Sequence, residues 1–152
     1  MTQPDPRPLS QALVGTWRLT SRIDVTAAGE RRIDPALGAD PVALLYYDRA
    51  GHFAAQFMKR DRSGGADAPA AAGMPNNSRA QGGYDAYFGS YTVDDAAGTV
   101  TQRLEGALSR ENVGQVLTRG MRVEGDSLTI RVETAAADGA ALVRTLTFRR
   151  VG

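Results

Sequence analysis

The sequence of 152 residues contains no cysteine and a single histidine, His52. Without cysteine the chain can form no disulfide, no thiolate nucleophile and no thiolate-bound metal centre. One histidine is also too few for a histidine-rich metal site. These absences argue against a transition-metal enzyme, and we expect no cofactor.

Long apolar runs and a one-sided charge are missing as well. No run approaches the roughly 20 residues of a membrane-spanning helix, and the first eight residues, with three prolines, lack the apolar core of a signal peptide. The 18 Lys and Arg residues are balanced by 17 Asp and Glu residues, which points to neither nucleic acid nor an anionic membrane as a partner. We therefore expect a cytoplasmic protein that is a monomer or a homodimer.

Alternation of apolar and polar residues is the main pattern that is present. It begins at Trp17 and continues to Asp24 with the period of a half-buried strand, so Trp17 should point inward. Further strands are predicted at 42–47, 52–59, 89–94, 99–108, 114–124, 127–134 and 140–151. Consecutive hairpins without long amphipathic helices predict an all-β fold, a small antiparallel up-and-down β-barrel of about eight to nine strands.

Two segments interrupt this pattern. Residues 1–12 are predicted to form an N-terminal arm with a short helical turn capped by Ser10, and residues 13–152 form the barrel domain. Residues 60–83 are rich in Gly, Ala and Pro and are either a flexible lid over the barrel mouth or a disordered insertion. A second helical turn is predicted at 84–88.

Several blocks of sequence resemble a known family. They are LVGTWRL at 13–19, DPVALLYY at 40–47 with Gly51-His52, YFGSYTVD at 87–94, and Glu105-Gly106. This ordered set resembles the bacterial and fungal lipocalin-like domain family over residues 13–151. The resemblance implies a barrel with a central cavity, in a family that includes members associated with small-molecule metabolism. Relatives often have histidines before Glu105-Gly106, whereas this chain has Gln102 and Arg103, so histidine-based catalysis is not carried over.

Two arginines alternate in phase with apolar residues. Arg119 shares a predicted strand face with Met121, and Arg144 shares one with Leu146. A buried guanidinium needs a carboxylate or an anionic ligand. The two arginines therefore form a clamp for a carboxylate, enolate or phenolate, or each pairs with an internal acid such as Glu105, or another register leaves it solvated.

His52 is the natural candidate for proton transfer because its ordinary pKa lies near neutrality. Alternation groups His52 with Gln56 and Met58, opposite Phe53, and either set can face the bore. With the first set inside, His52 joins Tyr46 and Gln56 in a polar cluster. With the second set inside, His52 is an exposed residue beside a turn. The candidate catalytic residues are His52, Glu105 and Tyr87.

All five tyrosines flank the Gly-rich segment, and a tyrosine offers an apolar ring with a hydroxyl that can bind an oxyanion. Simple packing with a satisfied hydroxyl is the alternative. The predicted ligand-binding residues are Tyr46, Gln56, Met58, Tyr84, Tyr91, Gln102, Arg119 and Arg144.

Barrel closure brings the last strand beside the first. Arg149 or Arg150 can then stack on Trp17 and close the barrel floor, next to Gly15. These residues are predicted to have structural roles.

Three functions remain open at this point. The first is binding of one small, largely apolar, anionic or enolisable molecule in the barrel cavity. The second is a cofactor-independent isomerase, cyclase or lyase that uses the same cavity, with His52 or Glu105 moving a proton. The third is a ligand-free scaffold that only dimerises, with Leu, Phe and Trp side chains filling the bore.

Overall fold

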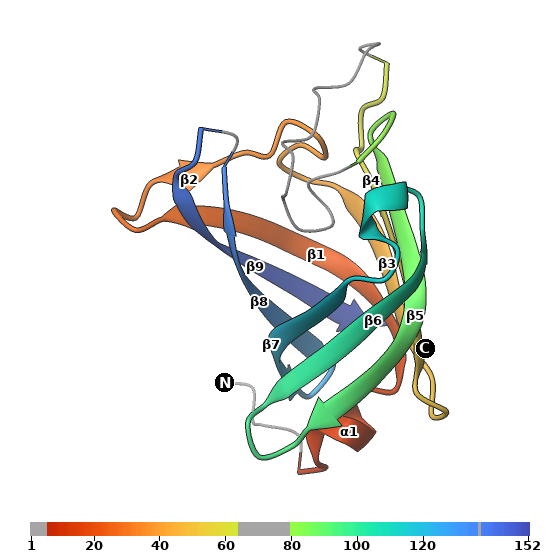
Figure 1. Cartoon of the computed structure of the whole chain (residues 1–152). Helices are drawn as coiled ribbons and strands as arrows, with labels where there is room; N and C mark the ends of the chain where they lie inside the picture. The colour runs from red at the N-terminus through yellow and green to blue at the C-terminus, as the bar shows by residue number, and fades with distance from the viewer. Residues whose placement is uncertain (1–5, 64–79, 137) are drawn as a thin grey trace.

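The computed structural model describes residues 6–63, 80–136 and 138–152, and these form one short α-helix, one 3-10 turn and nine strands (Figure 1). The helical elements are α1 (Leu9–Ala12) and η1 (Arg110–Asn112). The strands are β1 (Gly15–Thr26), β2 (Arg31–Arg32), β3 (Val42–Tyr47), β4 (His52–Met58), β5 (Tyr84–Asp94), β6 (Thr99–Ala107), β7 (Val116–Glu124), β8 (Ser127–Ala135) and β9 (Ala141–Arg150). Neither of these helices is long and apolar enough to cross a membrane.

The strands form a closed antiparallel barrel, as the sequence predicts. Each strand from β3 to β8 pairs with the next along the chain, β1 pairs with β3, and the additional pairing of β1 with β9 closes the ring of eight strands. The remaining strand, β2, lies outside this ring and pairs with the second half of β1, where Arg32 lies opposite Asp24. Closure removes the exposed strand edges that an open sheet of this size would leave.

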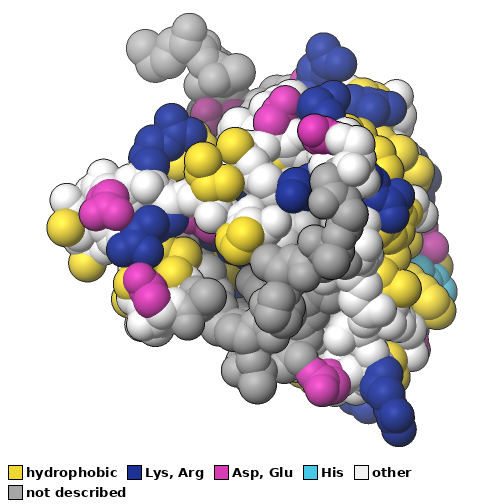
Figure 2. Space-filling view, turned by 90° about the horizontal axis from the view of Figure 1, so that it is seen from above, with side chains coloured by type: hydrophobic (Ala, Val, Ile, Leu, Met, Phe, Trp, Pro, Cys, Tyr) yellow, Lys and Arg dark blue, Asp and Glu magenta, His cyan; other side chains and the backbone are white. Residues whose placement is uncertain are grey.

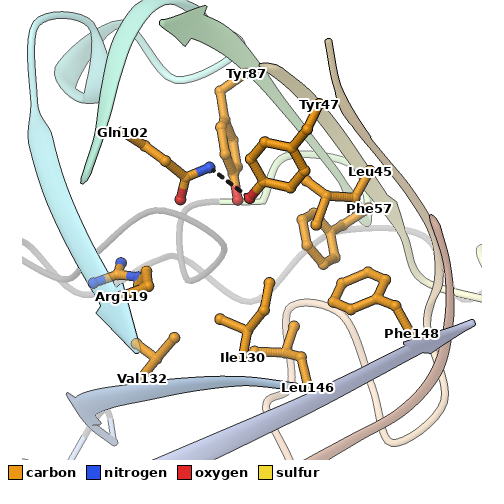
Figure 3. A pocket seen from close by; sticks show the side chains of 10 residues that line it. All are labelled: Leu45, Tyr47, Phe57, Tyr87, Gln102, Arg119, Ile130, Val132, Leu146 and Phe148. Carbon is orange, nitrogen blue, oxygen red and sulfur yellow. Dashed lines mark hydrogen bonds between the residues drawn. The ribbon is translucent and has the colours of Figure 1, made fainter. Parts of the chain in front are cut away.

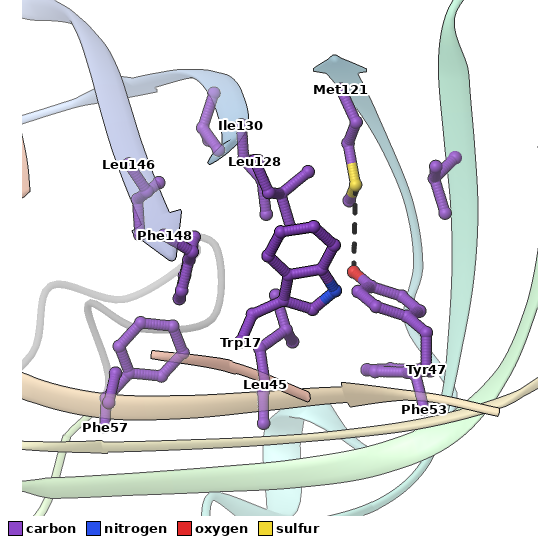
Figure 4. Packing of buried hydrophobic residues seen from close by; sticks show 14 of the residues in the cluster. Trp17, Leu45, Tyr47, Phe53, Phe57, Met121, Leu128, Ile130, Leu146 and Phe148 are labelled. Carbon is purple, nitrogen blue, oxygen red and sulfur yellow. Dashed lines mark hydrogen bonds between the residues drawn. The ribbon is translucent and has the colours of Figure 1, made fainter. Parts of the chain in front are cut away.

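Large apolar side chains from alternate strand positions fill much of the bore. Trp17 points inward and is completely buried, among neighbours that include Leu45, Leu128 and Phe148 (Figure 4). On β4 the inward residues are Phe53, Ala55 and Phe57, because the bulky aromatic rings gain most from burial.

The barrel floor is built by Trp17 and Arg150, as predicted. The Arg150 guanidinium lies 4.3 Å from the centre of the Trp17 ring and donates hydrogen bonds to the carbonyl oxygens of Val14 and Ala12. Gly15 has a φ of +144°, and a Cβ there would lie 2.6 Å from Arg150 Nη1. Arg149, the alternative candidate, faces outward and is exposed. Arg150 and not Arg149 therefore covers Trp17, and we call its contacts with Trp17, Val14 and Ala12 the latch.

A β-bulge in β1 makes the predicted orientation of the second half of this strand wrong. Its pairing with β9 shifts register between Leu19 and Ser21, so the alternation that begins at Trp17 reverses in the second half of the strand. Arg22 and Asp24, which simple alternation would place outside, are both buried. The inner face of β1 thus changes from apolar to charged along its length.

Two local predictions are wrong and one remains open. Residues 84–88 form the start of β5, because Tyr84, Tyr87 and their neighbours pair with β4 over its whole length. Ser10 lies inside α1, where its hydroxyl donates to Asp95, and Pro8 occupies the N-cap. The centre of the predicted 60–83 lid falls outside the described residues, so that hypothesis stays a prediction.

Candidate functional site

A small cavity lies in the bore of the barrel, lined by side chains of the strands from β3 to β9 (Figure 3). Its volume is about 30 Å³, which holds one or two water molecules, whereas sites for drug-sized ligands typically have about 300–1,000 Å³. The residues that line it are Leu45, Tyr47, Phe57, Tyr87, Gln102, Arg119, Ile130, Val132, Leu146 and Phe148. Four polar side chains thus face an otherwise apolar wall.

Tyr47 and Gln102 are hydrogen bonded to each other inside this wall. Gln102 Nε2 donates to the Tyr47 hydroxyl at 3.2 Å, and the hydroxyl donates to the Met121 sulfur at 3.7 Å. Burial raises the pKa of Tyr47 well above its ordinary value, and the neighbouring Tyr87 and Tyr91 raise it further. Tyr47 therefore acts in this cavity as a neutral hydroxyl group.

Arg119, on β7, is half-buried and lines the same cavity as Tyr47 and Gln102 (Figure 3). Burial lowers the pKa of Arg119, nearby Tyr87 raises it, and the positive charge of Arg144 lowers it. Arginine nevertheless stays protonated because its ordinary pKa is above about 12. The cavity wall consequently carries a permanent cation next to Tyr87, Gln102 and Tyr47.

Arg144 does not join Arg119 in a clamp. Its Nε and Nη2 atoms donate to the two carboxylate oxygens of Asp24 at 2.8 and 2.9 Å, and both side chains are buried. Arg22 Nη2 in turn contacts Asp34 Oδ2 at 3.0 Å, and Arg144 Nη2 lies 3.8 Å from the same oxygen. The alternative of an internal acid is therefore correct for Arg144, although the acid is Asp24 rather than Glu105.

His52 and Glu105 lie outside the barrel. The His52 side chain is 64% exposed, and its Nδ1 atom contacts Asp48 Oδ2 at 3.2 Å. Glu105 is also exposed, at a register shift between β5 and β6. Of the two orientations left open for His52, the exposed one beside a turn is correct, because the aromatic residues of β4 occupy the inner face. Glu105, also a candidate catalytic residue, does not line the cavity.

Four predicted ligand-binding residues share the outer face of β3, β4 and β5 instead. They are Tyr46, Gln56, Met58 and Tyr84, and the Tyr84 hydroxyl donates to Gln56 Oε1 at 2.9 Å. Gln56 lines an open surface hollow of about 270 Å³, together with Ala54, Ala86 and Phe88. Figure 2 shows apolar side chains gathered on the flank that also carries the histidine.

The remaining predicted residues are close to the cavity. Tyr87 and Gln102 line it, and Tyr91 stacks edge-on against Tyr47 with ring centres 4.9 Å apart. The Tyr91 hydroxyl donates to the backbone oxygen of Asp48 at 2.6 Å, so this side chain supports the wall rather than lining the space.

Sequence reasoning missed several polar residues of this region, among them Tyr47, Asp24 and Asp34. Tyr47 was one of the five tyrosines but was not distinguished from Tyr46, although the alternation with Leu45 signals an inward position. Asp24 and Asp34 were missed because a bulge and an irregular loop place them, and neither feature has a clear sequence signal.

Within the described residues no group of three or more His, Cys, Asp or Glu side chains is arranged to hold a metal ion.

Comparison with known proteins identifies the family. A search of curated proteins finds no match to the chain. The model of the lipocalin-like domain matches residues 14–151, which is nearly the whole chain. Together with the closed barrel, this match shows that the protein belongs to the lipocalin-like domain family, a fold consistent with small-molecule binding.

Proposed function

We propose that the barrel binds one small, largely apolar molecule with an anionic or enolisable end. The observation that carries this proposal is the position of Arg119 in the cavity wall, beside the polar groups of Tyr47, Tyr87 and Gln102. A cation with adjacent hydrogen-bond donors in a site of low polarity matches a carboxylate, enolate or phenolate. The aliphatic and aromatic wall opposite would contact the apolar part of the ligand.

The size of the cavity adds a requirement to this proposal. A volume of about 30 Å³ is less than even a short alkyl chain occupies, so binding must widen the bore. Ile130 and Leu146 in the cavity wall are side chains whose rotation would create space. The ligand-bound barrel is therefore expected to differ from the present one in the conformation of this wall.

The enzymatic alternative is not retained in its original form. Its proton carriers were His52 and Glu105, and both side chains lie on the outer surface. Tyr87 is the member of that set that lines the cavity, and a phenol hydroxyl there fits the binding of an oxyanion.

Calorimetric titration with octanoate and octanol tests the binding proposal, because these ligands share an apolar chain and differ in charge. Octanoate should bind saturably and more tightly than octanol. Arg119→Met should weaken octanoate binding by about 1.5–3 kcal/mol, or about 10–150-fold, and leave octanol binding unchanged.

Arg122→Met is the matched control, since Arg122 lies on the same strand and its side chain is 70% exposed on the outer face. Equal loss in both variants would contradict a role for Arg119 in the cavity. Absence of saturable binding by the folded wild-type protein would reject the proposal and favour the scaffold alternative.

A further inference from the structure

Five aromatic rings form a continuous row along one side of the bore. They come from β3, β4 and β5, which are neighbouring strands of the sheet. Each ring contacts the next, with ring centres 4.9–6.3 Å apart, in the order Tyr91, Tyr47, Phe53, Tyr87 and Phe57. In a close-packed interior a ring held between two others has little room to change rotamer. The row therefore makes this side of the bore stiff.

Three rings of the row line the cavity, and a mainly aliphatic surface lies across from them. The three are Tyr47, Tyr87 and Phe57, whereas Phe53 belongs to the same row but does not line this cavity. The opposite surface comes from β8 and β9 and consists of Ile130, Val132 and Leu146 beside Phe148 (Figure 3). When the bore widens, the branched aliphatic side chains can change rotamer, while the row of rings stays in place.

The last two rings of the row are nearly parallel. The planes of Phe57 and Tyr87 differ by 20°, and their centres lie 6.3 Å apart. Aromatic rings attract one another in offset-stacked and edge-to-face arrangements, beyond the effect of the apolar area that they bury. A planar ring placed beside this pair can form such contacts with both members. A saturated ring or an alkyl chain has no ring face with which to form them.

We infer that the apolar part of the ligand is a planar aromatic ring, bound between the Phe57–Tyr87 pair and the aliphatic surface of β8 and β9. This inference rests on the proposed function of the cavity, and it narrows the ligand to an aromatic acid or a phenol. Phe57 and Tyr87 then determine specificity, because their rings discriminate between planar and saturated ligands of equal charge.

Benzoate and cyclohexanecarboxylate test the inference, because both have one carboxylate on a six-membered carbon ring and only benzoate is planar. Burial of apolar area alone favours the saturated ring, which has the larger apolar surface. In NMR titrations of the wild-type protein at neutral pH, benzoate should bind about 3–10-fold more tightly. Bound benzoate should also shift the methyl resonances of Ile130 and Leu146 through its ring current, and cyclohexanecarboxylate should not.

Variants on β4 provide the second test. Phe57→Leu removes one ring but keeps an apolar side chain, and should reduce the preference for benzoate by about threefold. Phe53→Leu is the matched control, because Phe53 lies on the same inner face, is 3% exposed against 2% for Phe57, and does not line the cavity. Its preference should equal that of wild type. Each preference is a ratio of two affinities within one protein, so a general loss of affinity cancels.

Circular dichroism establishes that each variant is folded, and the wild-type affinities and methyl shifts decide the matter if Phe57→Leu is not. Equal or tighter binding of cyclohexanecarboxylate by wild type, binding of neither ring acid, or an unchanged preference in folded Phe57→Leu would overturn the inference. In each case, binding of octanoate that weakens in Arg119→Met and not in Arg122→Met would leave the proposed function standing. Absence of octanoate binding as well as ring-acid binding would reject both.

Discussion

Tyr47 and Tyr46 are adjacent residues with the same functional group and opposite surroundings. Tyr47 is 2% exposed and faces the bore, whereas Tyr46 is 38% exposed and faces outward. Burial raises the pKa of the Tyr47 hydroxyl, because ionisation would place a charge where water cannot hydrate it. At the scale of single residues, burial thus makes the Tyr47 hydroxyl resistant to ionisation.

This difference predicts an alkaline stability profile. Above a pH of about 10 the unfolded chain loses the Tyr47 proton while the folded chain keeps it, so the free energy of unfolding falls as pH rises toward the folded pKa. Tyr47→Phe should make this decline shallower in urea unfolding measured from neutral to alkaline pH. Burial also raises the pKa of Tyr91. The Tyr47→Phe variant should therefore keep part of the decline.

Tyr46→Phe serves as the control for this experiment, because it removes a hydroxyl of the same kind from the outer face. Its alkaline decline should match that of wild type. A parallel decline in all three proteins would mean that Tyr47 ionises equally well in the folded and unfolded chain.

At the scale of elements, the β2–β3 loop is fastened into the barrel by both apolar and ionic contacts. Leu37 is fully buried in the core and Ala36 is 7% exposed. Asp34 accepts hydrogen bonds from Arg22 and from the backbone N–H of Ala36, at 3.0 and 2.9 Å. Figure 1 shows this loop at the end of the barrel opposite α1.

Asp34→Asn should therefore destabilise the protein by about 3 kcal/mol, because it leaves a buried arginine without its carboxylate. Hydrogen exchange should accelerate first in residues 33–41. Asp40→Asn in the same loop breaks an ion pair with Arg60 whose side chains are both more than 60% exposed, and should cost less than about 1 kcal/mol. Equal effects of the two substitutions would show that the Arg22–Asp34 ion pair contributes no more to the free energy of unfolding than an exposed ion pair does.

The strands themselves could largely be predicted from the sequence, whereas their inner faces could not. Alternation locates β4, but it leaves open whether His52 or Phe53 points inward, since both sets contain apolar residues. The size of the Phe53 and Phe57 rings is the feature that decides the direction. In β1 alternation fails at the bulge after Leu19, because one extra residue exchanges the two faces.

At the scale of the whole molecule, the barrel depends on the pairing of its first and last strands. Arg150 joins them at the floor, where it covers Trp17 and binds two backbone carbonyl oxygens near the start of β1. Arg150→Met should lower the free energy of unfolding by about 2–4 kcal/mol, through loss of the cation–π contact and of donors for these carbonyls.

Trp17 fluorescence during chemical unfolding measures this effect directly, since Trp17 is the only tryptophan. Arg149→Met, next to it but exposed, should change stability by no more than about 0.5 kcal/mol. A small effect of Arg150→Met would show that strand pairing closes the floor without the latch.

Closure of the barrel could be predicted from the consecutive hairpins, and so could a contact of Trp17 with a C-terminal arginine, although the sequence did not decide between Arg149 and Arg150. The extent of the cavity could not, since it depends on how side chains from β3, β5, β7 and β9 interdigitate. Arg119 could be recognised from the sequence because it interrupts an apolar face. Its place in one cavity with Tyr47 and Tyr87 could not, because those residues come from strands on other parts of the barrel wall.

The β1–β9 pairing also orders the events of folding. Trp17 and Arg150 are separated by nearly the whole chain, so β1 must wait for β9 while the intervening strands form their local hairpins. Contacts between such distant residues slow folding, and until they form, the free edges of β1 and β9 can pair with other chains. Protection from aggregation is thus acquired in one late step, when the two ends of the sheet meet.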